Sequence, residues 1–202
     1  MVVRARSRRE RGVRPELRPG VHRWSSPVRY ARKEPGAHHR PVSQRSRPPQ
    51  GPFPYRHPIE VRFADTDALG HVNNAVYLSY FEAARAGYYH AMAGTPFGHG
   101  EMGARHTFLV AEARVAWRAP AFFGEPLVCE CRVAWVSRSS FGLEYRLSAE
   151  GSSVAPARSV ADGDSVQVMF DLKAGRVMRV PPDLLELMDR FEGRQILRRR
   201  PE

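Results

Sequence analysis

The sequence has only two cysteines, Cys129 and Cys131, among its 202 residues. Because they are two residues apart, their side chains would point to the same face of a strand and are poorly placed to link two elements. No further Cys or His lies at the short spacing that a zinc site requires. We therefore expect no disulfide framework, no metal site, and a reducing, cytoplasmic environment.

Long apolar runs are also absent. No stretch reaches the roughly 18 consecutive apolar residues of a transmembrane helix. The first residues lack the apolar core of a secretory signal. These absences predict a protein without a membrane span.

Positive charge is plentiful but is concentrated in one part of the chain. Residues 1–56 contain 15 Lys or Arg and 3 Asp or Glu, a net charge of +12, whereas residues 57–202 contain 17 and 18, a net charge of −1. The first segment is rich in Arg, Pro, Ser and Gly and has almost no hydrophobic periodicity, so we predict that it is disordered. An RNA- or phospholipid-binding arm, a targeting extension and a segment without specific function all fit it. The rest is near neutral, so nucleic acid is not an expected partner of the domain.

Residues 57–193 carry the patterns of a folded α+β domain. Alternation of apolar and polar residues predicts strands at 57–63, 108–118, 127–136, 141–147 and 166–172, with a short strand at 177–180. A long helix is predicted at 75–92, ended by Gly94, and a shorter helix at 183–191 follows two prolines. Residues 194–202 are predicted to be a basic tail.

Successive strands joined by short turns favour an antiparallel sheet. The long helix is apolar over much of its surface, so the sheet must cover it. We therefore predict an antiparallel sheet wrapped around one central helix. The roughly 145 residues from 57 to 202 are few for covering both sheet faces, which favours a homodimer or a homotetramer.

Residues 65–77, DTDALGHVNNAVY, form the most informative segment. Asp67 precedes His71 by four residues, and Asn73 and Asn74 open onto the long helix, where either is a credible N-cap. The first N–H groups of a helix are unpaired and favour negative charge. A carboxylate beside such donors is suited to hydrolysis of an activated carbonyl, which needs an oxygen nucleophile and stabilisation of an oxyanion. Asp65 is expected to make structural hydrogen bonds.

The segment VRFADTDALGHVNNAVYLSYFEAAR is similar to the hotdog-fold acyl-CoA thioesterases of the 4-hydroxybenzoyl-CoA thioesterase-like family. The resemblance extends from about residue 57 to 190 and includes 117–120 (WRAP), 123–125 (FGE) and 139–141 (SSF). It implies a hotdog fold and a cofactor-independent enzyme. The implied substrate is a thioester of coenzyme A or of an acyl-carrier protein, bound at a subunit interface.

The resemblance also implies roles for single residues. The second acid of D-x-D, Asp67, would be the nucleophile or the general base, and backbone N–H groups near Asn73 and Asn74 would polarise the thioester carbonyl. Arg138, before the Ser-Phe pair, would hold phosphates of coenzyme A. His71 either orients the substrate carbonyl or supports the loop.

We therefore predict an acyl-CoA thioesterase. The alternative is a non-catalytic hotdog protein that binds acyl thioesters or scaffolds an assembly. A hotdog hydratase is disfavoured because HVNNAV lacks the Asn-Pro pair of those enzymes. A nucleic-acid-binding protein that acts through its basic segment is a further alternative.

Overall fold

The computed structural model describes residue 49 and residues 51–96 and 106–198. Its strands are β1 (Tyr55–Glu60), β2 (Phe108–Trp117), β3 (Pro126–Val136), β4 (Ser140–Ala149), β5 (Arg158–Asp171) and β6 (Arg176–Val177). The helices are η2, a 3-10 turn (Phe63–Asp65), α1 (Val76–Ala93) and α3 (Pro182–Glu192). The predicted α+β class is confirmed.

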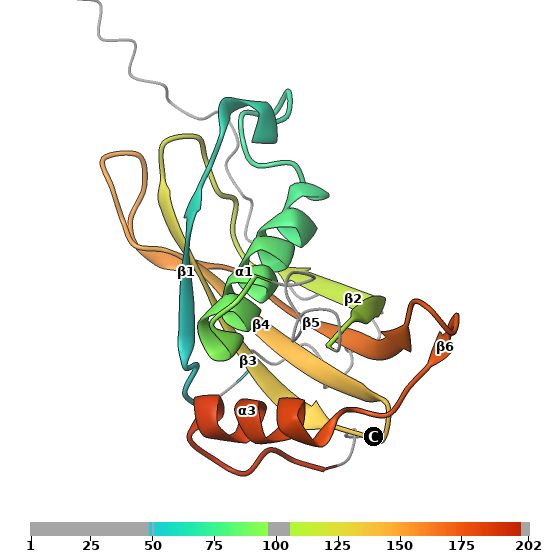
Figure 1. Ribbon diagram of the computed structural model, residues 1–202. Helices are drawn as coiled ribbons and strands as arrows, with labels where there is room; N and C mark the ends of the chain where they lie inside the picture. Colours follow the sequence, from blue (N-terminus) through green and yellow to red (C-terminus); the bar gives the residue numbers. More distant parts are fainter. Residues whose placement is uncertain (1–48, 50, 97–105, 199–202) are drawn as a thin grey trace, which may run out of the picture. The chain divides into compact units, whose positions relative to one another are not determined.

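Every strand pairing is antiparallel, in the order β1-β3-β4-β5-β2, with β6 beside β5. Strands β1 and β2 thus form the two edges of the sheet. Figure 1 shows α1 lying across one face of the sheet, with the loop that precedes it at one end and α3 at the other. The predicted arrangement of a sheet around one long helix is confirmed.

Helix α1 lies within one residue of its predicted bounds and ends at Gly94, whose φ of 70° is the left-handed conformation that favours glycine. Its apolar side packs on the centre of the sheet. The ring of Phe81 stacks on Tyr145 of β4, with centroids 4.5 Å apart and an interplanar angle of 6°. Beneath it, a Cβ on Gly163 of β5 would collide with the Phe81 ring. The close approach of helix and sheet therefore requires glycine at this position.

Strand β5 differs most from its prediction. It begins at Arg158, eight residues before the predicted start. The sequence of its first half contains two aspartates and a glycine, which hide the alternation of a strand. The residues that face α1 are the polar Ser165 and Gln167 together with Met169, and all three are buried. The apolar residues at 166, 168 and 170, which carried the prediction, belong to the opposite face of the strand.

The segment around β1 also departs from the pattern. The strand ends at Glu60, and Phe63, predicted as an inward strand residue, begins η2 with 77% of its surface exposed. Before β1, the guanidinium carbons of Arg132 and Arg146 lie 4.7 and 4.6 Å from the centre of the Phe53 ring. Contacts with the sheet thus begin before the predicted domain start at residue 57. Residues 1–48, the bulk of the segment predicted to be disordered, lie outside the described residues.

The C-terminal segment packs on β3 through polar contacts. Glu192 accepts hydrogen bonds from the Tyr88 hydroxyl at 2.7 Å and from the Val133 N–H at 2.6 Å. Arg194 donates to the Val133 carbonyl at 2.7 Å, and Ile196 is buried. Residues 194–198, predicted as part of a tail, are therefore packed against the sheet, and residues 199–202 lie outside the described residues. No helix in the described part of the chain is both long and apolar enough to cross a membrane.

Candidate active site

The loop between η2 and α1 is closed by backbone hydrogen bonds. Thr66 and Val72 form an antiparallel bridge, and the Asp67 N–H donates to the His71 carbonyl at 3.0 Å. Gly70, with a φ of 78°, donates to the Asp67 carbonyl at 3.0 Å and turns the chain. The Val72 N–H donates to Ala121 O at 2.8 Å, which fixes the loop to the β2–β3 connection. The loop is therefore a closed turn held against the sheet.

Asp65 anchors the start of this loop. Its buried carboxylate accepts the backbone N–H of Arg62 at 2.9 Å, the Arg62 guanidinium at 2.7 Å and the Tyr80 hydroxyl at 3.0 Å. The hydrogen bond from the Arg62 side chain is the largest cause that lowers the pKa of Asp65. Because Tyr80 belongs to α1, this carboxylate ties the loop to the helix. The predicted structural role of Asp65 is confirmed.

Asp67 is placed differently from Asp65, although only one residue separates them. Its side chain is 26% exposed, and Oδ1 accepts the backbone N–H of Leu69 at 2.8 Å. Oδ2 lies 3.6 Å from Nδ1 of His71, whose side chain is 29% exposed. The structure thus brings together the two residues that the sequence proposed for catalysis. One carboxylate oxygen is fixed by the turn, and the other faces an imidazole at the surface.

The two asparagines that follow have separate environments. Asn73 Oδ1 accepts the Ala75 N–H at 2.9 Å, its carbonyl accepts the Val76 N–H at 2.9 Å, and its own N–H donates to Asp65 O at 2.9 Å. The helix N-cap is Ala75, without a side-chain cap, so the prediction of an asparagine at the N-cap position is wrong. Asn73 still satisfies the N–H groups at the helix start, from two residues further back. Asn74 is exposed next to it.

Aromatic side chains surround this end of the domain. Phe63 contacts Phe123 edge to face at 5.9 Å, and Tyr77 contacts Trp117 in the same way at 6.4 Å. Phe123 and Trp117 are 54% and 49% exposed. Burial is the main cause that raises the pKa of Tyr77, and the charge of nearby Asp67 adds to the rise. Phe63 and Phe123 were not predicted as site residues, because they are 60 residues apart in the sequence and only the fold brings their rings into contact.

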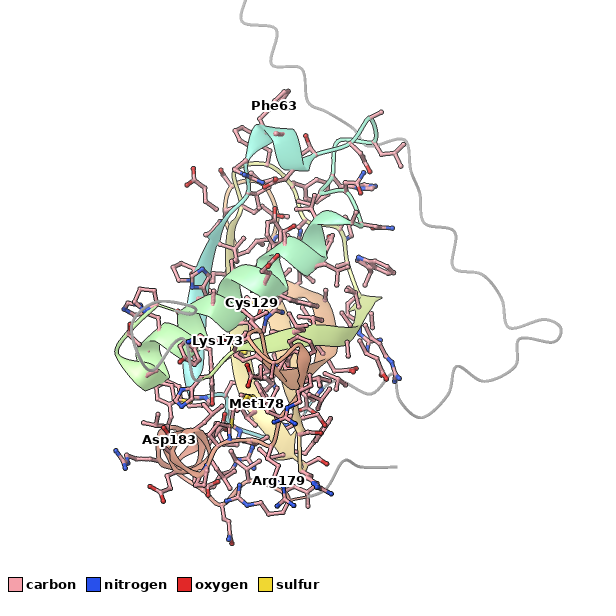
Figure 2. All side chains as sticks on the ribbon, turned by 45° about the vertical axis from the view of Figure 1, so that its right-hand side comes forward. Phe63, Cys129, Lys173, Met178, Arg179 and Asp183 are labelled. Carbon is pink, nitrogen blue, oxygen red and sulfur yellow. The ribbon has the colours of Figure 1, made fainter. Side chains whose placement is uncertain are left out.

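Arg138 lies far from this loop within one chain. It is exposed in the β3–β4 connection, and its carbonyl accepts the Val180 N–H at 3.0 Å. Figure 2 shows Arg179 and Asp183 at one end of the domain and Phe63 at the other. The 11 residues of β3 separate these ends by roughly 35 Å, at about 3.3 Å per residue. The structure therefore does not bring Arg138 and Asp67 of one chain to the same site.

The side chains near this loop also bear on metal binding. Within the described ranges, no group of three or more His, Cys, Asp or Glu side chains is placed to hold a metal ion. The two cysteines are buried and unpaired by any disulfide, and burial raises the pKa of both thiols. The groups described at the loop itself are the Asp67 carboxylate, the His71 imidazole and peptide N–H groups.

Known proteins resemble this chain in sequence and in architecture. The sequence profile of the Thioesterase-like superfamily matches residues 61–188. A thioesterase from Thermus thermophilus, crystallised with coenzyme A and Zn, is 34% identical, with 70% of this chain and 96% of that chain covered and a TM-score of 0.59. A curated protein of Aquifex aeolicus (strain VF5), named as a candidate esterase, is 29% identical over 138 residues, which are 68% of this chain and 98% of the relative.

The fold extends to more distant structures. A variant of 4-hydroxybenzoyl-CoA thioesterase, crystallised with 4-hydroxybenzoyl-CoA, is 21% identical, with 66% of this chain and 96% of that chain covered and a TM-score of 0.58. At this identity the likeness concerns the fold, which is an antiparallel sheet with a helix packed against it. The profile match over most of the folded region and this shared architecture show that the chain belongs to the thioesterase-like superfamily and has the hotdog fold.

Proposed function

We propose that this protein is an acyl-thioester hydrolase in which Asp67 carries the chemistry. The observation that supports this most directly is the position of its carboxylate, which is partly exposed at the entrance to α1 and held there by the Leu69 N–H. Membership of a thioesterase-like superfamily supplies the reaction class. The thioester is one of coenzyme A or of an acyl-carrier protein, and the products are a free acid and a thiol.

Asp67 either attacks the thioester carbonyl or removes a proton from the attacking water. Both roles require an ionised carboxylate with one accessible oxygen, and Oδ2 is the oxygen that the turn leaves available. His71, 3.6 Å from Oδ2, is the residue that can orient this carboxylate or contact the substrate. A thiolate leaves readily, so the reaction needs little assistance from a general acid.

The donors that polarise the thioester carbonyl are proposed to lie at the start of α1. Asn73 uses its amide oxygen, its carbonyl and its N–H in bonds within the chain. We therefore assign it a positioning role and assign contact with the substrate to the exposed Asn74, through its side chain and its backbone N–H. Donors at such a position stabilise the oxyanion, and the loss of one typically costs about 10²–10³ in turnover.

The site is proposed to be completed by a second copy of the chain. In the described part of the chain, β2 pairs with β5 on one side and with no strand on the other. Its side chains are exposed over most of its length, including Leu109 and Val110 at 49% and 45%. Such an edge suits association with another chain. Only a second copy can bring an Arg138 to the phosphates of a thioester bound at Asp67.

The test is hydrolysis of a panel of acyl-CoA esters by Asp67→Asn, measured by release of free thiol. We expect a loss of at least about 10²-fold in kcat, the scale of a removed general base. A matched control is Asp171→Asn, because Asp171 also accepts backbone N–H groups in a turn, from Lys173 at 2.9 Å and Ala174 at 3.0 Å. That variant should retain the wild-type rate.

Two results separate this proposal from its alternatives. Near-normal hydrolysis by Asp67→Asn would show that another residue carries the chemistry. Binding of acyl-CoA without hydrolysis by the wild-type protein, across short, long, branched and aromatic acyl groups, would favour a non-catalytic acyl-thioester-binding protein.

A further inference from the structure

An arginine of α1 is buried between the helix and the sheet with few polar contacts. Arg85 lies on the helix edge that carries Tyr89, which contacts Phe108 of β2 at 6.2 Å. Its side chain is only 14% exposed. A guanidinium stays charged at any physiological pH, so burial of this group is costly unless hydrogen bonds and an opposite charge compensate it.

The contacts of Arg85 in the described chain are weak. Its Nη1 donates to the Tyr145 hydroxyl at 3.4 Å, and its Nη2 lies 3.8 Å from Glu82, whose side chain is 73% exposed. An exposed carboxylate at this distance contributes little, because water screens the pair. The other guanidinium side chains buried to a similar degree have shorter partners. For example, Arg132 is 13% exposed and donates to Glu144 at 2.6 Å.

The sheet below Arg85 is polar where a hotdog core would be expected to be apolar. The Tyr145 hydroxyl lies 2.7 Å from Ser165 Oγ, and Gln167 donates to the same oxygen at 2.6 Å. All three side chains are at least 98% buried. Burial is the main cause that raises the pKa of Tyr145, so its hydroxyl remains protonated and shares a hydrogen bond with Ser165. The buried guanidinium therefore lies above a chain of hydroxyl and amide groups.

We propose that Arg85 and Tyr145 form a subsite for a carboxylate at the far end of the acyl group, so that the preferred substrates are thioesters of dicarboxylic acids. This inference rests on the proposed function, because it concerns the acyl group of the same thioester. A carboxylate would accept two N–H donors of the guanidinium and supply an opposite charge at shorter range than the exposed Glu82, which lies 3.8 Å away. Ser165 and Gln167 hold the Tyr145 hydroxyl in place for this contact.

The position of Arg85 along the helix sets the length of the acyl group. Arg85 follows the first residue of α1, Val76, by nine positions, or about 13 Å at 1.5 Å per residue. Helical side chains lean towards the N-terminus, so the guanidinium lies on the order of 10 Å from the helix start. At about 1.5 Å per carbon–carbon bond, this span corresponds to an acyl chain of roughly six to eight carbon atoms.

The experiment compares matched thioesters that differ only in the terminal group: hexanoyl-CoA with hexanedioyl-CoA, and octanoyl-CoA with octanedioyl-CoA. The wild-type protein, Arg85→Met and Glu82→Gln are assayed with each pair. We expect the wild type to prefer the dicarboxylic ester in kcat/KM by about 10- to 100-fold, as hydrogen bonds to a charged group suggest. Arg85→Met should remove this preference, because kcat/KM for the dicarboxylic ester falls towards that for its monocarboxylic counterpart.

The control variant Glu82→Gln removes the exposed partner of Arg85 and should keep the preference, which shows that the effect does not come from the ion pair on the helix surface. Arg85→Lys serves as a second variant if Arg85→Met does not fold, and it should keep part of the preference because it retains the charge. Thermal melting and light scattering of each variant verify its fold and its assembly.

The outcomes separate the two proposals. Hydrolysis of both esters at equal rates, unaffected by Arg85→Met, would overturn the carboxylate subsite while the thioesterase function stands. No hydrolysis of any ester by the wild type would overturn the proposed function itself. Dissociation of an oligomer in Arg85→Met, with no change in preference, would show that Arg85 pairs with a second chain and not with substrate.

Discussion

The substitution Asp65→Asn tests whether the first aspartate of the motif anchors the loop. In the structure the side chain of Asp65 is 3% exposed and accepts the backbone N–H and the guanidinium of Arg62 and the hydroxyl of Tyr80. Asparagine has nearly the same shape but only one acceptor oxygen, and its NH2 group would face the guanidinium. The variant therefore loses hydrogen bonds without creating a cavity.

The expected cost follows from these contacts. The guanidinium of Arg62 is 71% exposed, so solvent screens its ion pair with Asp65 and this pair adds little to the cost. The buried bonds from the Arg62 N–H and the Tyr80 hydroxyl go to a charged acceptor, and such bonds contribute about 1.5–3 kcal/mol each. Both bonds go to Oδ2, so an asparagine with its oxygen at this position keeps them as neutral bonds of about 0.5–1.5 kcal/mol each. We expect the free energy of unfolding to fall by about 2–3 kcal/mol, and by about 1 kcal/mol in Tyr80→Phe.

The effect should depend on pH in a defined direction. The hydrogen bonds from Arg62 hold the pKa of Asp65 below its ordinary value of 3.8. A lowered carboxylate pKa contributes stability above pH 3.8, and this stability is lost as the pH falls through the folded-state pKa. The deficit of Asp65→Asn should thus be complete at neutral pH and should shrink below about pH 3.8.

Urea unfolding of the wild type, Asp65→Asn, Tyr80→Phe and the double variant, each at neutral and at acidic pH, measures both effects. The double variant should cost less than the sum of the single ones, because Asp65→Asn weakens and Tyr80→Phe removes the same bond between residues 65 and 80. Equal stability of Asp65→Asn and wild type at neutral pH, or a deficit that grows on acidification, would refute the anchoring role.

Two further predictions concern other parts of the chain. Burial is the main cause that raises the pKa of Glu192 above its ordinary 4.5, so the stability that this side chain contributes is complete below pH 4.5 and is lost as the pH rises through the raised pKa. Glutamine can accept the same bonds from Tyr88 and Val133 without ionising. The melting temperature of the wild type should therefore fall relative to that of Glu192→Gln as the pH rises above 4.5, and parallel profiles of the two proteins would contradict this. On the edge strand β2, Val110→Arg should convert an oligomer to monomers in light scattering, whereas Leu172→Arg, at an exposed site outside β2, should not. An unchanged mass for Val110→Arg would remove β2 from the proposed interface.

Much of the fold could be predicted from periodicity. The helical spacing of apolar residues in 75–92 and the strand alternation in 127–136 are strong signals, and both elements lie within one residue of their predicted bounds. Strand β5 was only half recognised, because its inward positions include Ser165 and Gln167. A strand prediction assumes that the apolar residues are the ones that face the core. In β5 a buried polar network faces the core instead, so the assumption fails for this strand.

The order of strands in the sheet was less accessible. Neighbours in sequence often pair, yet β2 pairs with β5 and not with β3, which follows it in the chain. This pairing places β2 at an edge and leaves its side chains exposed on both faces, although the sequence at 108–118 alternates as a half-buried strand would. The apolar alternation at 108–118 fits a strand that a second chain would cover. The structure of one chain does not show this burial.

In the site, too, contacts between residues close in sequence could be predicted, and contacts between residues far apart in sequence could not. His71 follows Asp67 by four residues, and a closed turn brings their side chains together, so their proximity was readable from the sequence. Arg138 was assigned to the substrate by resemblance alone, and the sheet holds it at the opposite end of β3. Arg85 follows Glu82 by three residues, the spacing of an ordinary salt bridge on a helix surface, so the sequence gives no reason to assign it to a site. Only the burial of one partner and the exposure of the other reveal how little that pair compensates.

The two aspartates of the motif illustrate why burial decides between chemically equal candidates. In an extended strand, residues 65 and 67 would point to the same side and could share a site. The 3-10 turn at Phe63–Asp65 and the bridge between Thr66 and Val72 break this relation. Asp65 turns inward, where Arg62 and Tyr80 occupy its oxygens, and is thereby unavailable to a substrate. Asp67 keeps one oxygen at the surface beside His71, so a reaction at this loop that needs a free carboxylate can draw only on the second acid.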